Sequence, residues 1–174
     1  MKTNLVILAL ASLAISACST PPKPTVAPPP PHVVEAPAPV VETHVISAAE
    51  LEAQKLAAQL EEMRNKSVYF DFNKFAVKKE YRDLIMERAE LLKAHGNVTV
   101  TLEGNADERG SSEYNLALGN KRANAVRSAL KLIGVPDSQI KTTSMGEEHP
   151  RLACHAEKCW KENRRVDFVG KQGS

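Results

Sequence analysis

The sequence predicts an α+β domain in which one mixed sheet is covered by two long helices, behind a long segment without a core. Two observations locate the domain. All eight aromatic residues fall between Tyr69 and Phe168, and nine of the eleven prolines fall between Pro21 and Pro39. A core therefore starts near residue 67, and the remaining stretch of about 100 residues is a normal size for one domain.

Strand and helix patterns then alternate along the chain, which is the third observation. β-branched and aromatic residues predict strands, apolar residues at helical spacing predict helices, and Gly96 and Gly134 end the two long helices. The order β-α-β-α-β-(short α)-β indicates a two-layer sandwich with a mixed sheet. We expect strands at 68–72, 98–102, 140–145 and 165–169, long helices at 77–95 and 116–133, and a short helix at 157–163.

The segment 47–66 predicts a helical linker in front of the domain. Ser47 is placed as an N-cap and Glu50 as its capping-box partner. The apolar stripe is thin and no heptad persists, so we expect a solvated helix rather than a coiled coil. The stripe consists of Leu51, Leu56, Leu60 and Met63.

Residues 1–17 resemble the signal peptide of bacterial lipoproteins. The apolar run 5–15 has eleven residues, too few to span a membrane, and Ile15-Ser16-Ala17-Cys18 resembles a lipobox. The resemblance implies cleavage before Cys18, which then carries an S-diacylglycerol group and an N-acyl chain. Ser19, in place of Asp, implies delivery to the outer membrane. The alternative is an ordinary signal peptide with an incidental cysteine.

Residues 18–46 predict a flexible tether. The composition is dominated by Pro, Val and Ala, including the run Pro28 to Pro31, and it cannot bury a core. Such a chain extends by about 3.1 Å per residue, so its reach is at most about 80 Å. A docking site for a proline-binding module is the alternative.

Charge and motifs exclude several classes of function. The net charge of +2 gives no field for nucleic acid. The sequence has no Ser nucleophile elbow, HExxH motif or phosphate-binding loop. Asp107 and Glu108 are adjacent and would diverge, so they are poorly placed to flank a glycosidic bond. We therefore expect no enzyme activity, no metal and no cofactor other than the lipid on Cys18.

A candidate binding site lies where the second strand leads into the second long helix. Asp107 is on the connecting loop, while Asn115, Leu118 and Arg122 share one helical face, with Gly119 opening that face beside the guanidinium. One acid and one arginine on separate elements suit a zwitterionic ligand, with Arg122 on a carboxylate and Asp107 facing an ammonium. The alternative is a structural salt bridge between Asp107 and Arg122.

Two cysteines remain once Cys18 is lipidated. Cys154 and Cys159 form an even count in an oxidising compartment, which favours a disulfide. Residues five apart in a continuous helix are out of disulfide reach, so Cys154 must precede the helix. Free thiols, or a zinc site with His155 that lacks a visible fourth ligand, are the alternatives.

The run EGNADERGSSEYNLALGNKRANAV, with VYFDFNKF before it and ENRRVDF after it, resembles the OmpA-like peptidoglycan-binding domain. The resemblance covers 67–170 and leaves 171–174 as a tail. It implies non-covalent binding of meso-diaminopimelate in uncrosslinked stem peptides, by Asp107 and Arg122. Asn115, Leu118 and the loop of Phe72 and Asn73 would assist. Family members often have Asp where Asn73 stands, so a charge contact there is lost. These six residues are the predicted ligand site.

The lipobox, the tether and the domain together resemble the lipoproteins of the Tol system. This implies a protein on the outer membrane, facing the periplasm, that links the membrane to peptidoglycan and supports envelope integrity and constriction at division. It also implies TolB and the Tol complex as partners, with Glu108 and Arg109 as candidate contacts beside a purely structural role for both. The alternatives are a lipid-anchored peptidoglycan binder without a Tol partner and a lipid-anchored cell-wall hydrolase.

Overall fold

A computed structural model of the chain describes residues 47–173. The predicted signal peptide, the lipidation site Cys18 and the proline-rich tether lie outside the described residues. Within 47–173, no helix is both long and apolar enough to cross a membrane.

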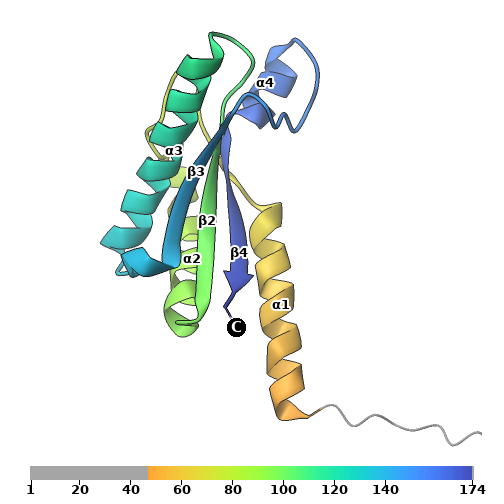
Figure 1. Ribbon diagram of the computed structural model, residues 1–174, viewed down its shortest axis with the longest axis vertical. Helices are drawn as coiled ribbons and strands as arrows, with labels where there is room; N and C mark the ends of the chain where they lie inside the picture. Colours follow the sequence, from red (N-terminus) through yellow and green to blue (C-terminus); the bar gives the residue numbers. More distant parts are fainter. Residues whose placement is uncertain (1–46, 174) are drawn as a thin grey trace, which may run out of the picture. The chain divides into compact units, whose positions relative to one another are not determined.

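Within the described residues, four strands and three α-helices follow in the predicted order, after the helix α1 at the N-terminal end (Figure 1). Two short 3-10 turns, Lys79–Tyr81 and Asp137–Gln139, precede α2 and β3. The elements are α1 Ala48–Asn65, β1 Val68–Tyr69, α2 Arg82–Ala94, β2 Val98–Asn105, α3 Ser112–Leu132, β3 Ile140–Gly146, α4 Glu157–Asn163 and β4 Arg165–Gln172.

The described strands form one mixed sheet in the order β1-β4-β2-β3. β2 and β3 are parallel, whereas β4 is antiparallel to both β1 and β2. Along β2 the side chains of Val98, Val100 and Leu102 are buried and the residues between them are half-exposed. This alternation shows that one face of the sheet carries the core and the other stays open.

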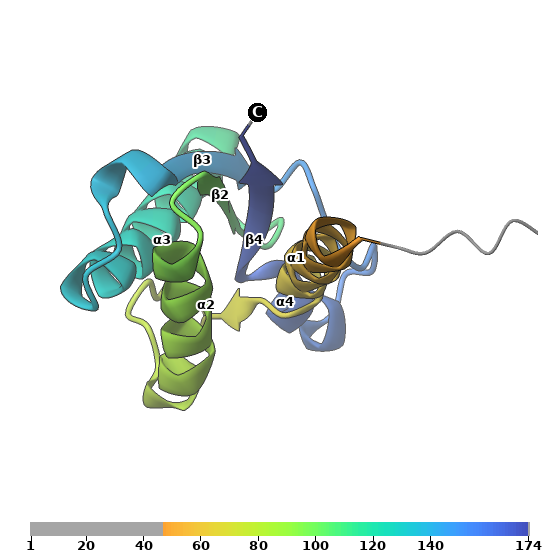
Figure 2. The ribbon, with the colours of Figure 1, turned by 90° about the horizontal axis from the view of Figure 1, so that it is seen from below.

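Helices α1, α2 and α3 each contribute buried residues to the core on this face of the sheet, and Figure 2 shows them beside the strands. α2 and α3 were expected there, and their apolar stripes pack on β2 and β4 through residues such as Ile85, Leu92, Val126 and Leu130. The predicted α+β architecture with a mixed sheet is therefore confirmed, and α1 is an additional covering helix.

The expectation that the helix at 47–66 is solvated is wrong. Ser47 and Glu50 do form the capping box. However, Leu56, Leu60 and Met63 are buried in the common core. The neighbouring strand residue is Gly170, where a Cβ would come within 2.7 Å of Leu60 Cδ2. The thin apolar stripe of α1 is enough to pack against the sheet, because β4 has no side chain at Gly170 and the helix can approach the strand there.

Gly119 has a different role from the one expected. A Cβ on Gly104 of β2 would lie 1.9 Å from the backbone oxygen of Gly119 in α3. The two glycines therefore bring the helix and the strand into direct backbone contact, and Gly119 does not open a ligand face. This close approach fixes the first turns of α3 against the end of β2.

The first and second strands also differ in length from the prediction. β1 ends at Tyr69, and the chain turns at Asn73, which has a φ of 56°. Asparagine tolerates this left-handed conformation better than most residues. β2 instead continues to Asn105, two residues into the expected loop, so that the loop begins directly at Ala106 and Asp107.

Candidate functional site

A pocket of about 260 Å³ lies where β2 leads into α3. It brings together five of the six residues predicted for the ligand site, while Arg122 does not line it. The lining residues are Phe72, Asn73, Asp107, Arg109, Gly110, Tyr114, Asn115 and Leu118.

The start of α3 places three of the predicted residues. The Ser111 hydroxyl caps the helix by accepting a hydrogen bond from the backbone N–H of Tyr114, at 3.2 Å. From that fixed start, Asn115, Leu118 and Arg122 are all buried on the inner face of α3. Helical spacing and the N-cap thus direct these side chains toward the end of β2.

Asp107 lines the pocket and is only 4% exposed. Its Oδ1 accepts hydrogen bonds from the backbone N–H of Arg109, at 3.1 Å, and from Arg109 Nε, at 3.0 Å. Its Oδ2 accepts from Arg109 Nη2, at 2.8 Å, and from Arg164 Nη1, at 3.2 Å. Burial acts to raise the pKa of Asp107, but the hydrogen bonds from Arg109 and Arg164 outweigh it and lower that pKa.

Arg109 is held between two aromatic rings. Its guanidinium carbon lies 4.0 Å from the ring centroid of Phe72 and 4.1 Å from that of Trp160. Both distances are typical of cation–π contacts. The hydrogen bond to Asp107 raises the pKa of Arg109. Arg109 therefore forms part of the pocket wall, in contact with the acid that was predicted to face the ligand.

Arg122 is fully buried and is not among the residues that line the pocket. Its guanidinium donates to three backbone oxygens, those of Asn105 at 2.7 Å, Lys74 at 2.9 Å and Asp71 at 3.3 Å. Burial lowers the pKa of Arg122 to about 10, so it stays charged at neutral pH. A guanidinium has five N–H groups, and two of them are left over by these three bonds.

No carboxylate pairs with Arg122 in the part of the chain that the structure describes. Asp107 pairs instead with Arg109 and Arg164, at 2.8 and 3.2 Å. The alternative of a structural Asp107–Arg122 salt bridge is therefore not what the structure contains. The guanidinium of Arg122 also lies over the ring of Phe70, 5.4 Å from its centroid. A buried cation held by carbonyl dipoles and a ring face can still gain from an added anion.

Two further side chains of the pocket have hydrogen-bond partners outside α3. The Tyr114 hydroxyl donates to Asn73 Oδ1, which ties the turn after β1 to the helix. The Asn115 amide donates to Glu147, just after β3. Because the NH₂ group of Asn115 is engaged by a carboxylate, its oxygen is the atom oriented for accepting.

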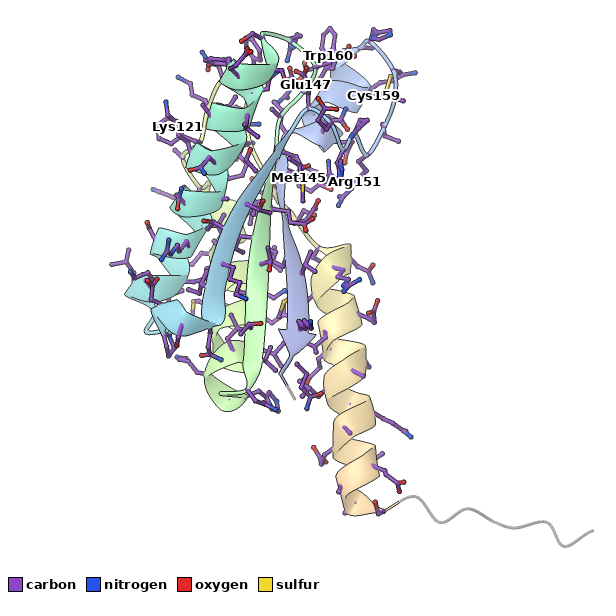
Figure 3. All side chains as sticks on the ribbon, viewed as in Figure 1. Lys121, Met145, Glu147, Arg151, Cys159 and Trp160 are labelled. Atoms are coloured by element: carbon purple, nitrogen blue, oxygen red, sulfur yellow. A yellow bond between two sulfur atoms is a disulfide. The ribbon has the colours of Figure 1, made fainter. Side chains whose placement is uncertain are left out.

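The helix α4 is joined to the pocket through the loop after β2. Glu108 accepts hydrogen bonds from Trp160 Nε1, at 2.8 Å, and from His155 Nδ1, at 2.7 Å, and these bonds lower the pKa of Glu108. Cys154 and Cys159 form a disulfide with a Cα–Cα distance of 5.7 Å, and Cys154 precedes the helix. Figure 3 shows Trp160 and Cys159 on this segment beside the start of α3.

Five residues of this site were not found from the sequence: Gly110 and Tyr114 of the lining, and Arg164, Trp160 and Glu147 around it. Arg164 is the most informative, because it is buried and donates to Phe70 O, to Asp107 and, at 2.6 Å, to Glu157. Two consecutive arginines at the start of an apolar strand, Arg164 and Arg165, were a usable signal. A strand of that kind is buried, so at least one of its flanking arginines needs an acidic partner.

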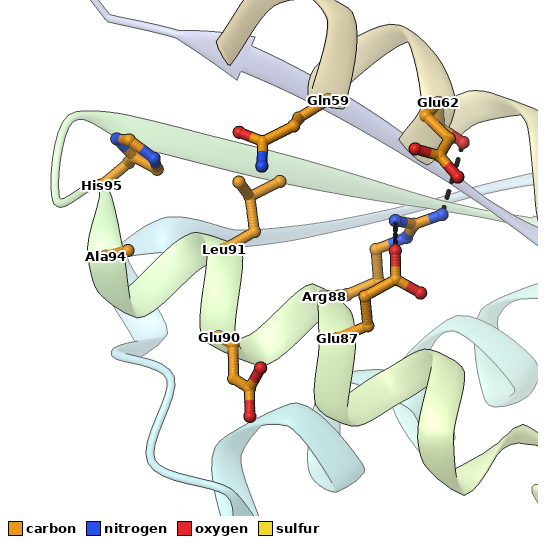
Figure 4. Close-up of a pocket in the computed structure, with 8 residues that line it drawn as sticks. All are labelled: Gln59, Glu62, Glu87, Arg88, Glu90, Leu91, Ala94 and His95. Atoms are coloured by element: carbon orange, nitrogen blue, oxygen red, sulfur yellow. Dashed lines mark hydrogen bonds and ion pairs between the residues drawn. The ribbon is translucent and has the colours of Figure 1, made fainter. Parts of the chain in front are cut away.

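A second cleft, of about 320 Å³, lies between α1 and α2 (Figure 4). Its central residue is Arg88, which is buried and donates to Glu87, at 2.9 Å, and to the backbone oxygen of Glu62, at 3.3 Å. The second bond caps a carbonyl in the last turn of α1, so Arg88 joins the two helices. Within 47–173 no group of His, Cys, Asp and Glu could hold a metal ion.

Comparison with known proteins agrees with this architecture. The OmpA family matches residues 69–164. A peptidoglycan-associated lipoprotein of Brucella melitensis biotype 1 is 40% identical over 102 residues, which cover 59% of this chain and 61% of the relative. The chain thus matches about three fifths of that relative's length.

Solved structures show the same fold. The peptidoglycan-associated lipoprotein of Burkholderia pseudomallei is 49% identical, with a TM-score of 0.60, over 61% of this chain and 90% of the neighbour. The C-terminal domain of Helicobacter pylori MotB, at 19% identity and a TM-score of 0.58, covers 63% of this chain and 86% of the neighbour and shares the fold alone. The family match spans more than half of the sequence, and the chain therefore belongs to the OmpA family.

Proposed function

We propose that the chain binds peptidoglycan without a covalent bond, through the meso-diaminopimelate of uncrosslinked stem peptides. The observation that carries the proposal is the buried Arg122, which has two unused N–H groups and no carboxylate partner among the described residues, next to Asp107. The Brucella and Burkholderia relatives are named peptidoglycan-associated lipoproteins, which supports peptidoglycan as the polymer that is bound. The role is binding and not catalysis, in keeping with membership of the OmpA family.

The chemistry of the pocket matches the free end of diaminopimelate, which carries an ammonium and a carboxylate on one carbon. The carboxylate would take the unused donors of Arg122, while the ammonium would take Asp107. Leu118 and the exposed Phe72 supply apolar surface for the methylene groups of the side chain. Asn115 offers its oxygen as a further acceptor for the ammonium.

Calorimetry tests this proposal with two stem peptides, one containing meso-diaminopimelate and one containing lysine. Both have the terminal amine, but only the first has the second carboxylate that Arg122 would bind. We expect heat of binding with the diaminopimelate peptide alone. Equal binding of both would contradict the role of Arg122, and binding of neither would remove the ligand assignment.

We further propose that lipid on Cys18 anchors the chain in the outer membrane, with the domain in the periplasm. The support is the lipobox-like Ile15-Ser16-Ala17-Cys18 and the word lipoprotein in the names of the relatives. The Cys18→Ala variant should lose incorporation of labelled palmitate and leave the membrane fraction. Retained labelling in that variant would contradict the anchor.

Exposed apolar side chains of the pocket lining, and of residues close to that lining in sequence, support a protein partner, which we propose to be TolB of the Tol–Pal system. Phe72, Phe75, Tyr114 and Leu116 are large apolar side chains that are all about half exposed. The earlier candidates Glu108 and Arg109 are engaged within the chain, which favours a structural role for them. The test is a pull-down of the chain with TolB. Capture that is weakened by Leu116→Ser and by added stem peptide would support a surface shared by TolB and peptidoglycan. Capture that neither change affects would contradict it.

A further inference from the structure

Asp107 has no lone pair left for a ligand. A carboxylate offers about four acceptor positions, two on each oxygen. In this structure Oδ1 accepts two hydrogen bonds from Arg109, and Oδ2 accepts one from Arg109 and one from Arg164. An ammonium group can therefore bind Asp107 only by displacing one of these donors.

The side chain of Arg109 is the donor that can leave. Arg164 is almost completely buried and is held by Phe70 O and Glu157 as well as by Asp107. The Arg109 side chain is 31% exposed and its other contacts are the faces of Phe72 and Trp160, with Glu157 at 3.7 Å. Displacing Arg109 breaks two side-chain hydrogen bonds and leaves the cation next to solvent.

From these contacts we propose that Arg109 is a displaceable internal cation that occupies the ammonium position of the ligand site and thereby sets its affinity and selectivity. The inference rests on the proposed function, because it concerns the same pocket. A ligand without an ammonium group gains nothing by displacing Arg109, so the side chain also discriminates against anions that Arg122 alone would attract.

Trp160 provides a direct report of this movement. It is the single tryptophan of the chain, and the Arg109 guanidinium lies 4.1 Å from its ring centroid. Departure of the cation from the indole face changes the surroundings of the fluorophore. Binding that displaces Arg109 should therefore change the emission of Trp160, and binding beside an undisturbed Arg109 should not.

The experiment compares the full chain with Arg109→Ala and with a matched control, Arg127→Ala. Arg127 contacts Asp137 in the same bidentate way, with Nε at 3.0 Å and Nη2 at 2.7 Å, but it lies toward the other end of α3. The probes are the stem peptide with meso-diaminopimelate and the same peptide acetylated on the terminal amine. Calorimetry gives the affinity and Trp160 emission gives the displacement.

We expect Arg109→Ala to bind the free-amine peptide about tenfold more tightly than the wild type, because one charge-assisted contact no longer has to be broken. Arg127→Ala should bind as the wild type does. The acetylated peptide should show no gain with Arg109→Ala. Saturating the wild type with the free-amine peptide should change Trp160 emission, and the same titration of Arg109→Ala should change it much less.

Unchanged or weaker binding by Arg109→Ala, or an unchanged Trp160 emission in the saturated wild type, would overturn the inference. If Arg109→Ala does not fold, Arg109→Lys serves instead, because it keeps the charge but loses the bidentate contact with Asp107. Tighter binding of the free-amine peptide by this variant supports the inference, and weaker binding overturns it. Failure of the wild type and the variants to bind any peptide would overturn the proposed function as well. Binding by the wild type without the expected change refutes only the role of Arg109.

Discussion

Two arginine–aspartate pairs in this molecule have the same geometry and different surroundings. Arg109 donates to Asp107 through Nε and Nη2 at 3.0 and 2.8 Å, and Arg127 donates to Asp137 through the same atoms at 3.0 and 2.7 Å. The Asp107 side chain is 4% exposed, whereas that of Asp137 is 50% exposed. Contact distance alone therefore does not distinguish a functional pair from an ordinary surface pair.

The difference lies in what else each acid touches. Asp137 has a second cation, Lys131 at 3.2 Å, but water reaches all three groups and screens them. Asp107 is surrounded by protein and has a second buried arginine, Arg164, that depends on it. Burial makes the Asp107–Arg109 pair, here called the inner pair, consequential, because Asp107 and Arg164 cannot turn to water when a partner is removed, whereas Arg109 is partly exposed.

The largest expected effect is that of Asp107→Asn. This change removes the buried anion from Arg109 and Arg164 and leaves the exposed Glu157 as their remaining carboxylate partner. Loss of one partner of a buried pair costs about 3 kcal/mol of unfolding free energy. The matched change, Asp137→Asn, should leave the urea midpoint where it is in the wild type. Urea unfolding of both variants measures the difference, and equal midpoints would show that burial of Asp107 is not what separates the pairs.

Removal of the disulfide should have the next largest effect. Replacing Cys154 and Cys159 by serine opens a six-residue loop, and the chain-entropy model gives a loss of about 2 kcal/mol. The inner pair should also respond, because Trp160 adjoins Cys159 and covers Arg109. Trp160 emission should shift in the double variant and in the wild type treated with a reductant. Reductant should do nothing further to the double variant.

Acid provides a graded test of the same comparison. The folded state lowers the pKa of Asp107, so the unfolded chain binds more protons and stability rises with pH in the acid range. That contribution is present above the ordinary aspartate pKa of about 3.9 and is lost as the pH falls through the lower folded value. Asp107→Asn should therefore flatten the acid limb of a stability–pH curve. Asp137→Asn should flatten it less, although the pKa of Asp137 is also lowered.

The smallest effect should come from the aromatic cover of the inner pair. Trp160→Leu removes one face of the contact around Arg109 and the hydrogen bond to Glu108. A cation–π contact at a partly exposed site contributes about 0.5–1 kcal/mol. Thermal unfolding should show a loss of that size, and Trp160→Phe, which keeps a ring, should lose less. A larger loss would mean that Trp160 supports the core of α4 rather than Arg109.

Local patterns were sufficient for most of the fold. Apolar and polar residues alternate in 98–102, which predicted β2. Apolar residues at helical spacing around Val126 and Leu130 predicted α3, because each pattern places apolar side chains on one buried face. The prediction that α1 is exposed to solvent was wrong. Its residues Leu56, Leu60 and Met63 are buried against β4, which is more than 100 residues away in sequence. The stripe looked thin only because its partner surface was not visible in the sequence.

The pocket was predicted as a set of residues but not as a set of contacts. Helix spacing placed Asn115, Leu118 and Arg122 on one face, and the loop after β2 placed Asp107 beside it. The partner of Asp107 was ambiguous, since both a ligand and Arg122 were reasonable. Arg109, two residues away, and Arg164, 57 residues away, take that place instead.

The sequence by itself determined the family, the order of the elements and the helix face on which the site is built, because these depend on residue types at short, regular spacings. Only the tertiary structure decided that the backbone oxygens of Asp71, Lys74 and Asn105 accept the hydrogen bonds of Arg122. It also decided that Arg109 is hydrogen-bonded to Asp107. Those choices depend on which groups burial brings together. Where burial limits access to water, each charged group pairs with whichever partner the packing places within reach.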